Sequence, residues 1–334
     1  MPELQEPQLE KKKTYKWFQL LLVFSALVLG IGYTLRLLTP TKIEVQPTLN
    51  RNYQGSTTRF EKVTFVGTTP DLPKELVVAT AENFVPLNFE DRTIKDKLIA
   101  QYKLQRNPNV PELWVSPDYA LQEIPSTGSY ELSTQVALPV DKIADSLTAL
   151  ETAQKFVAAV LPGNNLQLLD KKVVYRDADA HGDITEPTQA GLIDVPFGFE
   201  IDSYPIYLEK SLEYPVRVMI NADNQIQKAT FHPFFLTPKI DGKIKTLTVA
   251  EALANINANK ATIISSYYEG FESESLEQIT SAALNTITIE YRVSSDTKRI
   301  VPYYRFSGQL INAQGQQFYG EIITPAVQTE DAQS

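Results

Sequence analysis

Residues 247–251 read LTVAE, and residues 147–151, one hundred positions earlier, read LTALE. Each string has the Thr-x-x-Glu form of a capping box. In such a box the threonine hydroxyl accepts a hydrogen bond from a backbone N–H three residues on, and the glutamate accepts one from the cap. Apolar residues at helical spacing follow each box, so we predict helices over Ala149–Leu161 and from Val249 to about Ala258.

Short strand candidates follow both helices in a similar order. They lie at residues 172–176, 198–208, 215–220 and 225–232 after the first helix, and at 286–293, 300–310 and 317–323 after the second. The string NADN at 221–224 predicts a hairpin turn. Because runs of strands stand beside isolated helices, the pattern predicts an α+β fold of tandem helix-plus-antiparallel-sheet units.

We expect two such units at residues 145–240 and 245–327, and a degenerate copy at 60–140 that carries a weak helix over 93–102. The remaining ranges are interpreted as a cytoplasmic tail, a transmembrane helix, a linker and a disordered tail, at residues 1–16, 17–38, 39–59 and 328–334 respectively.

The transmembrane prediction rests on the uncharged run WFQLLLVFSALVLGIGYTL, from Trp17 to Leu35. As a helix it would be about 28 Å long, close to the hydrocarbon thickness of a bilayer. Lysines cluster before it, at positions 11, 12, 13 and 16, so the positive-inside rule places the N-terminus in the cytoplasm and residues 43–334 outside. A cleaved signal peptide is the alternative, but the run is longer than a signal core and no small-x-small cleavage site follows it.

Composition excludes several classes of site. The chain has no cysteine, which rules out disulfides, thiolate metal sites and cysteine nucleophiles. Its net charge of −9 disfavours nucleic acid as a partner, and no glycine-rich phosphate loop is present.

Two stretches resemble a known family. Residues 197–234 read FGFEIDSYPIYLEKSLEYPVRVMINADNQIQKATFHPF, and residues 289–326 read IEYRVSSDTKRIVPYYRFSGQLINAQGQQFYGEIITPA. Both are similar to the YycH/YycI-type accessory proteins of a Gram-positive sensor kinase, and more loosely to PepSY modules. The resemblance implies one N-terminal transmembrane helix, repeated α+β units, no catalytic residue, no cofactor and a sensor kinase as partner. Tyr303-Tyr304 stands where the family tends to have tryptophan, and GEIIT at 320–324 replaces its usual ending.

The sharpest motif for a metal is the acidic string DADAHGDI at residues 177–184, which carries Asp177, Asp179 and Asp183. Calcium loops place oxygen ligands at alternate positions and glycine at the sixth, where Gly182 stands. However, the fifth position is His181, a poor ligand for a hard cation, and the twelfth is Thr188 rather than glutamate. An ion-free acidic turn is therefore the favoured interpretation, with calcium as the alternative.

Catalytic arrangements are weakly indicated. Only two histidines exist, His181 and His232, and no Gly-x-Ser-x-Gly elbow accompanies them. Glu200 with Asp202, or Glu272 with Glu274, would supply a carboxylate pair for an enzyme acting on cell-wall polymer. An acidic chain offers many such pairs by chance, so we expect no enzyme and no cofactor.

Tyrosine points instead to binding, because it is enriched at protein interfaces, although half-buried strands also favour it. We predict a contact surface for a partner in the insert at 265–276, with Tyr267, Tyr268 and Phe271. Gly30 and Gly32 would allow a second membrane helix to approach closely. The sequence thus favours a non-catalytic, membrane-anchored binding or regulatory protein that contacts another envelope protein. An envelope enzyme and a structural spacer are the alternatives.

Overall fold

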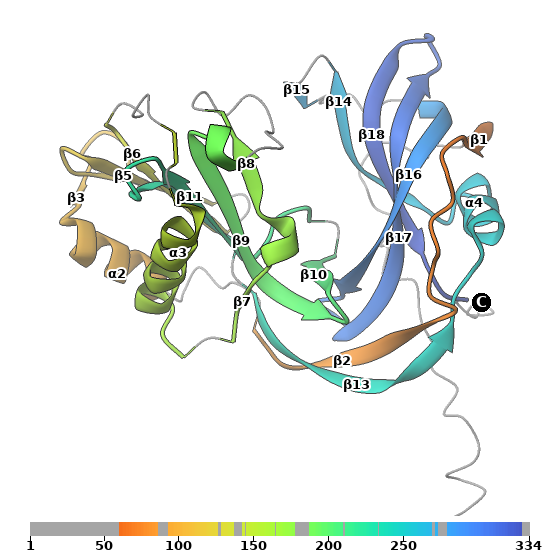
Figure 1. Ribbon diagram of the computed structural model, residues 1–334, viewed down its shortest axis with the longest axis horizontal. Helices are drawn as coiled ribbons and strands as arrows, with labels where there is room; N and C mark the ends of the chain where they lie inside the picture. Colours follow the sequence, from red (N-terminus) through yellow and green to blue (C-terminus); the bar gives the residue numbers. More distant parts are fainter. Residues whose placement is uncertain are drawn as a thin grey trace, which may run out of the picture. The chain divides into compact units, whose positions relative to one another are not determined.

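The computed structural model describes residues 60–85, 93–125, 128–136, 142–143, 145–163, 165–177, 187–209, 211–232, 234–268, 271–272 and 279–328. It confirms the α+β class: eighteen strands and three α-helices occur in these ranges (Figure 1). In the described part of the chain, no helix is long and apolar enough to cross a membrane. The predicted transmembrane segment, residues 17–38, lies outside the described residues.

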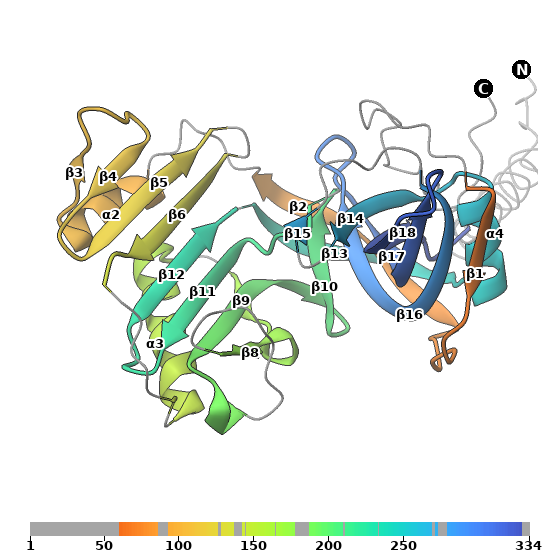
Figure 2. The same ribbon diagram turned by 90° about the horizontal axis from the view of Figure 1, so that it is seen from above.

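The first group of strands forms an antiparallel sheet with helices on one face, here called the helix-backed sheet (Figure 2). Its strands in spatial order are β3 (Gln105–Arg106), β4 (Leu113–Val115), β5 (Tyr119–Ile124), β6 (Ser129–Thr134), β12 (Ile226–Phe231), β11 (Val216–Asn221) and β9 (Leu192–Ile201). Two short strands, β7 (Gln167–Leu168) and β8 (Val174–Arg176), pair with the outer edge of β9, and the 3₁₀ turns η1 (Asp170–Lys172) and η2 (Pro187–Gln189) stand before and after β8.

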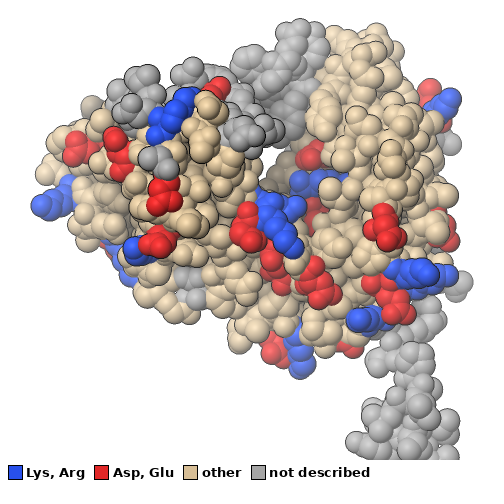
Figure 3. Space-filling model, in the orientation of Figure 1, with Lys and Arg blue, Asp and Glu red and all other residues tan. Residues whose placement is uncertain are grey.

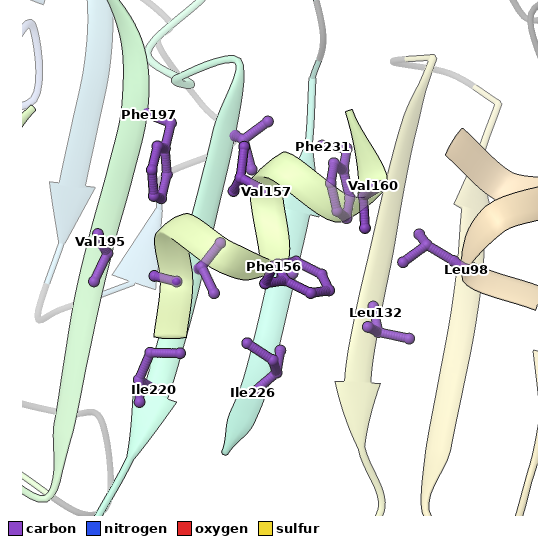
Figure 4. Packing of buried hydrophobic residues seen from close by; sticks show 14 of the residues in the cluster. Leu98, Leu132, Phe156, Val157, Val160, Val195, Phe197, Ile220, Ile226 and Phe231 are labelled. Atoms are coloured by element: carbon purple, nitrogen blue, oxygen red, sulfur yellow. The ribbon is translucent and has the colours of Figure 1, made fainter. Parts of the chain in front are cut away.

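The helices α2 (Thr93–Tyr102) and α3 (Ser146–Val160) cover one face of this sheet. Figure 4 shows Phe156 and Val157 of α3 lying over the strands, with Phe231 on one side and Phe197 on the other. Each of these side chains is buried, and burying a large apolar side chain contributes about 1.5–3 kcal/mol. The helix predicted over Ala149–Leu161 is therefore confirmed, although it runs from Ser146 to Val160.

The second group, here called the C-terminal sheet, is built around two long strands. Its antiparallel order is β10 (Tyr204–Leu208, itself parallel to β16), β16 (Ile279–Val293), β17 (Arg299–Asn312), β18 (Gln317–Pro325), β14 (Thr262–Tyr268) and β15 (Phe271–Glu272). A short strand, β1 (Lys62–Phe65), runs parallel to the start of β16. The strand β2 (Glu75–Val85) meets β17 briefly and pairs along its length with β13 (Phe235–Lys245), and α4 (Val249–Asn257) packs on β1 and β18.

The two sheets share strand β9. Residues 192–197 of β9 pair with β11 in the helix-backed sheet, and its last residues pair with β10, which continues into the C-terminal sheet. The turn between β9 and β10 is formed by Asp202 and Ser203, both with positive φ (51° and 68°). Residues 198–208, predicted as one strand, are therefore the end of β9, a two-residue hairpin turn and β10.

The two predicted capping boxes have different outcomes. At α4 the prediction is confirmed, since Thr248 is the N-cap and exchanges hydrogen bonds with Glu251. At α3 it is wrong, because the helix begins at Ser146 and its N-cap is Asp145, whose carboxylate accepts from the N–H of Leu147. Thr148 consequently lies inside the first turn.

The predicted turn at 221–224 joins the expected strands β11 and β12, and residues 294–297 and 312–315 likewise join β16 to β17 and β17 to β18. Residues 60–140, expected as one unit, contribute β1 and β2 to the C-terminal sheet and β3 to β6 to the helix-backed sheet. Residues 1–16 and 39–59 lie outside the described residues.

Candidate functional site

The face of the helix-backed sheet that α2 and α3 leave open carries a pocket of about 350 Å³. Side chains alternate between the two faces of a strand, and here the alternate residues of five strands are mostly polar. We call this site the polar pocket. It is lined by Ile124, Ser129, Tyr130, Glu131, Arg176, Asp194, Glu213, Arg217, Met219, Lys228, Thr230 and His232.

Asp194 on β9 is the most deeply buried charge in the polar pocket, with a side chain 3% exposed. Arg217 on β11 donates to it from Nε at 3.2 Å and also from Nη2. The Nη2 of Arg176 on β8 lies 3.5 Å from the same carboxylate. The buried carboxylate of Asp194 therefore holds two guanidinium groups, one from each of the strands that flank β9.

An ion pair and a contact between a carboxylate and an imidazole complete the polar pocket. The Nζ of Lys228 lies 2.9 Å from the carboxylate of Glu131 on the neighbouring strand β6. The Nε2 of His232 lies 3.8 Å from Glu213, and its backbone N–H donates to the carbonyl of Pro215 at 2.9 Å. Burial lowers the pKa of His232 below its ordinary 6.5, although Glu213 opposes the shift.

These pairings limit what the polar pocket can do chemically. A general acid or base needs a carboxyl or imidazole whose pKa is tuned for proton transfer, and a nucleophile needs a base beside it. Here each carboxylate faces a cation or the imidazole instead. Within the described ranges there is also no group of three or more His, Asp or Glu side chains placed to hold a metal ion.

A second polar cluster lies in the C-terminal sheet, and we call it the buried ion network. Glu290 and Arg292 on β16 each have a side chain only 2% exposed, and Arg292 donates from Nε to Glu290 at 2.6 Å. Arg305 on β17 places Nη2 2.5 Å from the other oxygen of Glu290. Both guanidinium groups lie 5.0 Å from the centre of the Tyr207 ring.

The buried ion network also binds the backbone between β10 and β11. Nη1 of Arg292 donates to the carbonyl of Glu209 at 2.7 Å and to that of Ser211 at 2.6 Å. The carboxylate of Glu209 accepts from the N–H of Ser295 at 2.9 Å and from its hydroxyl. The start of this connection is thus fixed to β16 and to the turn after it.

Two tyrosines connect the buried ion network with the polar pocket. The hydroxyl of Tyr207 donates to that of Tyr214 at 2.8 Å, and burial raises the pKa of both. Tyr214 interacts electrostatically with Arg305 of the network and with Arg217 of the pocket. The Tyr207–Tyr214 pair therefore lies between the charges of the two polar clusters.

The predicted metal residues are only partly described. Asp177 follows β8 directly and is half-buried, whereas Asp179, Asp183 and His181 lie outside the described residues. The ion-free acidic turn at 177–184 and its calcium alternative therefore both stay predictions.

Of the predicted contact residues, Tyr267 and Tyr268 lie on β14 and Phe271 on β15, which pair as a short hairpin. In the register of the C-terminal sheet, Tyr267 is opposite Tyr319, whose side chain is 52% exposed. Gly30 and Gly32 lie outside the described residues, so the predicted contact surface and the predicted helix–helix contact both stay predictions.

Only one of the two predicted carboxylate pairs is described in full, and it is not arranged as expected. Glu200 is on β9 but Asp202 is in the following turn, so strand alternation does not place them on one face. Glu272 is on β15, and Glu274 lies outside the described residues.

The residues of the polar pocket were mostly missed, although the sequence held one signal for them. Asp194 interrupts the apolar run LIDVPFGF at 192–199, and a charge in such a run implies a buried partner. The partners Arg176 and Arg217 lie on other strands, so only the sheet pairing identifies them.

Comparison with known proteins adds a limited likeness. The crystal structure of YycH from Bacillus subtilis is similar at a TM-score of 0.38 and 11% sequence identity, over 76% of this chain and 53% of that one. This chain thus spans about half the length of that protein. No family model matches the sequence, and neither does any curated protein. The likeness is a weak one of fold only.

Proposed function

We propose that this protein is a non-catalytic binding protein of the cell envelope, anchored in the membrane by residues 17–38, with residues 43–334 outside. It would act as a regulator by holding another envelope protein, such as a membrane sensor kinase, against the polar pocket. The observation that carries the proposal is an open sheet face whose charged side chains are all engaged with one another.

The pairing of charges favours recognition over catalysis. A reacting group must be free to gain or lose a proton, but Asp194 is held by two guanidinium groups. Groups fixed in this way present donors and acceptors in constant positions at little entropic cost on binding. A pocket of about 350 Å³ also falls at the lower end of the range for small ligands and suits one or two inserted side chains.

The partner proposed is a polypeptide. The polar pocket carries both signs of charge in neighbouring positions, with the cations of Arg217 and Lys228 beside the carboxylates of Glu131 and Glu213. The face shown in Figure 3 likewise has acidic and basic side chains next to each other rather than in single-sign patches. A polypeptide surface matches such a pattern, whereas a polyanion requires an excess of cations.

The proposal is tested by site-specific cross-linking in membranes. A photoreactive amino acid replaces Thr230, which lines the polar pocket, in the full-length protein. A control carries it at Lys155 on α3, which faces solvent on the covered side of the sheet and is 78% exposed. We expect one envelope protein to be captured from position 230 and not from position 155.

The matched charge variant is Lys228→Glu, which should reduce that cross-link by reversing one charge at the rim of the polar pocket. Absence of any captured protein at position 230, or equal capture at both positions, would contradict the proposal. Absence of capture would leave the spacer alternative, in which the sheets serve only to hold the C-terminus away from the membrane. The anchor is checked separately: alkaline carbonate should fail to extract the protein from membranes.

A further inference from the structure

The connection from Glu209 to Pro215 lies between the buried ion network and the polar pocket. Its first part is held by Arg292, which donates to the carbonyls of Glu209 and Ser211 at 2.7 Å and 2.6 Å. Its last part supplies Glu213 to the polar pocket and the Pro215 carbonyl that accepts the N–H of His232 at 2.9 Å. The same short segment therefore touches both polar clusters.

The charges in the buried ion network are better explained by positioning than by stability. A buried ion pair seldom stabilises more than apolar side chains of the same volume would, because both charges lose their hydration. What an arginine adds is direction, since its planar fork fixes several acceptors at once. In this case one edge of the Arg292 guanidinium meets Glu290, and Nη1 holds two backbone carbonyls.

The backbone of Glu209 shows that this hold is needed. Its φ is +42°, in the left-handed region, where a residue with a side chain is strained. Such a residue keeps its conformation only when its surroundings determine it. Here the carbonyl of Glu209 is bound by Arg292 and its carboxylate by the N–H of Ser295 at 2.9 Å.

We propose that the buried ion network is a latch for the polar pocket: Arg292 holds the connection from Glu209 to Pro215, and the connection holds Glu213 and His232 in place. Coupling of this kind is reciprocal, so an occupant of the polar pocket that moves Glu213 also weakens the hold of Arg292. This consequence for regulation rests on the proposed function, whereas the coupling itself does not.

The test uses His232 as a reporter and needs no partner. The chain has two histidines, so His181→Gln leaves His232 as the sole imidazole in the NMR spectrum. The charged groups that act on it are Glu213, Arg217 and Glu131, and burial is the largest influence on its pKa. In full-length protein in detergent, Arg292→Lys keeps the charge but loses the fork, so we expect the connection to loosen. Water then reaches the imidazole, and its measured pKa rises toward the ordinary value.

Hydrogen exchange of backbone amides provides a second readout. With Arg292→Lys we expect faster exchange over residues 211–217 and at the amide of His232, with no change in α3. The control is Ile289→Val on β16, which is buried in the core beneath α4 rather than in the network. It should lower stability without changing the pKa of His232 or the exchange over residues 211–217. If Arg292 contributed only to stability, Arg292→Lys would likewise change neither.

Ser295→Ala serves as a milder variant if Arg292→Lys does not fold, because it removes only one hydroxyl bond to Glu209. An unchanged pKa of His232 together with unchanged exchange in the folded variants would overturn the latch. If position 230 captures no protein but the pKa of His232 shifts in Arg292→Lys, the proposed function is wrong and the latch is supported. If position 230 captures a protein but the pKa of His232 does not shift, only the latch is wrong.

Discussion

At the scale of single residues, buried charge is the feature that distinguishes this molecule. Asp194 lies in strand β9, where the residues before and after it are apolar, and its side chain is 3% exposed. A charge at such a depth is tolerated because Arg176 and Arg217 surround it, and removing one member leaves the others unpaired.

We therefore predict that Asp194→Asn lowers the free energy of unfolding by about 3 kcal/mol, toward the lower end of the range for broken buried pairs because both arginines keep some contact with solvent. Urea titration followed by far-UV circular dichroism measures the change. Glu131→Gln in the same pocket is the control. Its pair with Lys228 is more exposed, so a loss below about 1 kcal/mol is expected. Equal losses of unfolding free energy in Asp194→Asn and Glu131→Gln would show that burial does not determine the cost of breaking an ion pair.

His232 gives the polar pocket a dependence on pH. Its pKa in the folded protein is lowered below the 6.5 of an unfolded chain, chiefly by burial. As pH falls below about 6.5, the unfolded chain binds a proton that the folded protein resists, so the free energy of unfolding decreases until the folded pKa is passed. The contribution of His232 to stability is thus present above the unfolded pKa and lost on the acid side.

We predict that His232→Gln reduces the fall in unfolding free energy between about pH 7.5 and pH 5, measured by urea titration at several pH values. Carboxylates that titrate in this range affect both proteins equally, so the difference between the two curves isolates the imidazole. A steeper fall in the variant would mean that Glu213 outweighs burial and that the pKa is raised.

At the scale of secondary-structure elements, local sequence predicted which segments form helices better than it predicted the residue at which each helix begins. Asp145 and Thr148 are both favoured N-cap residues, and the sequence alone gives no reason to prefer the first. The structure prefers Asp145 because the turn that it starts adds Ser146 and Leu147 to α3. At α4 the hydroxyl of Thr246, the other candidate, donates to the carbonyl of Pro73, and Thr248 caps the helix as the rule predicts.

The matched substitutions Thr248→Ala and Thr148→Ala test this difference. The first removes the N-cap hydroxyl of α4 and should lower the free energy of unfolding by about 1 kcal/mol. The second removes only a bond to the carboxylate of Asp145 at 2.6 Å and should cost less, because Asp145 still accepts from the N–H of Leu147. Thermal unfolding of both variants is the measurement, and a larger loss for Thr148→Ala would restore the original assignment of the cap.

The hairpin between β9 and β10 was missed for a different reason. A two-residue turn with positive φ at both positions normally carries Asn, Asp or Gly first and Gly second, and here Ser203 follows Asp202. The turn forms because both flanking strands are held by others, β9 by β11 and β10 by β16. Tertiary pairing thus determines a turn that local sequence does not indicate.

The edges of the sheets also depend on distant residues. The amide of Asn257 on α4 accepts from the N–H of Val63 at 3.0 Å, and so occupies one hydrogen-bonding position of strand β1. Strand β13 instead carries Pro238, Lys239 and a register shift before Gly242, features that disfavour edge-to-edge pairing. These devices are visible in the sequence only once the pairing is known.

At the scale of the whole molecule, the α+β class and the order of the C-terminal strands followed from periodicity and turn residues. The partition between sheets did not, because it depends on pairings such as β2 with β13, which join residues about 160 positions apart. The polar pocket was missed on the same ground: its charges come from five strands and two connections, and no local spacing brings them together.

Residues 45–334 form one compact unit in which both sheets share β9, and Arg292 fixes the connection between β10 and β11. We therefore predict that the two sheets unfold together. The chain has two tryptophans, and in a Trp17→Phe background the fluorescence of Trp114 on β4 reports the helix-backed sheet alone. A second protein adds Trp114→Phe and Tyr319→Trp to the same Trp17→Phe background, so that its fluorescence reports the C-terminal sheet. Position 319 is 52% exposed and so tolerates the larger ring.

Urea titration of the two proteins should give transitions with the same midpoint, since breaking either sheet removes the pairing of β9 on which the other depends. Arg292→Lys in each background weakens only the connection, so it should shift both midpoints together to lower urea. Midpoints that differ between the two reporters before any such change would contradict the shared-strand argument. The polar pocket would then belong to a sheet that opens independently, and the C-terminal sheet could not govern its geometry.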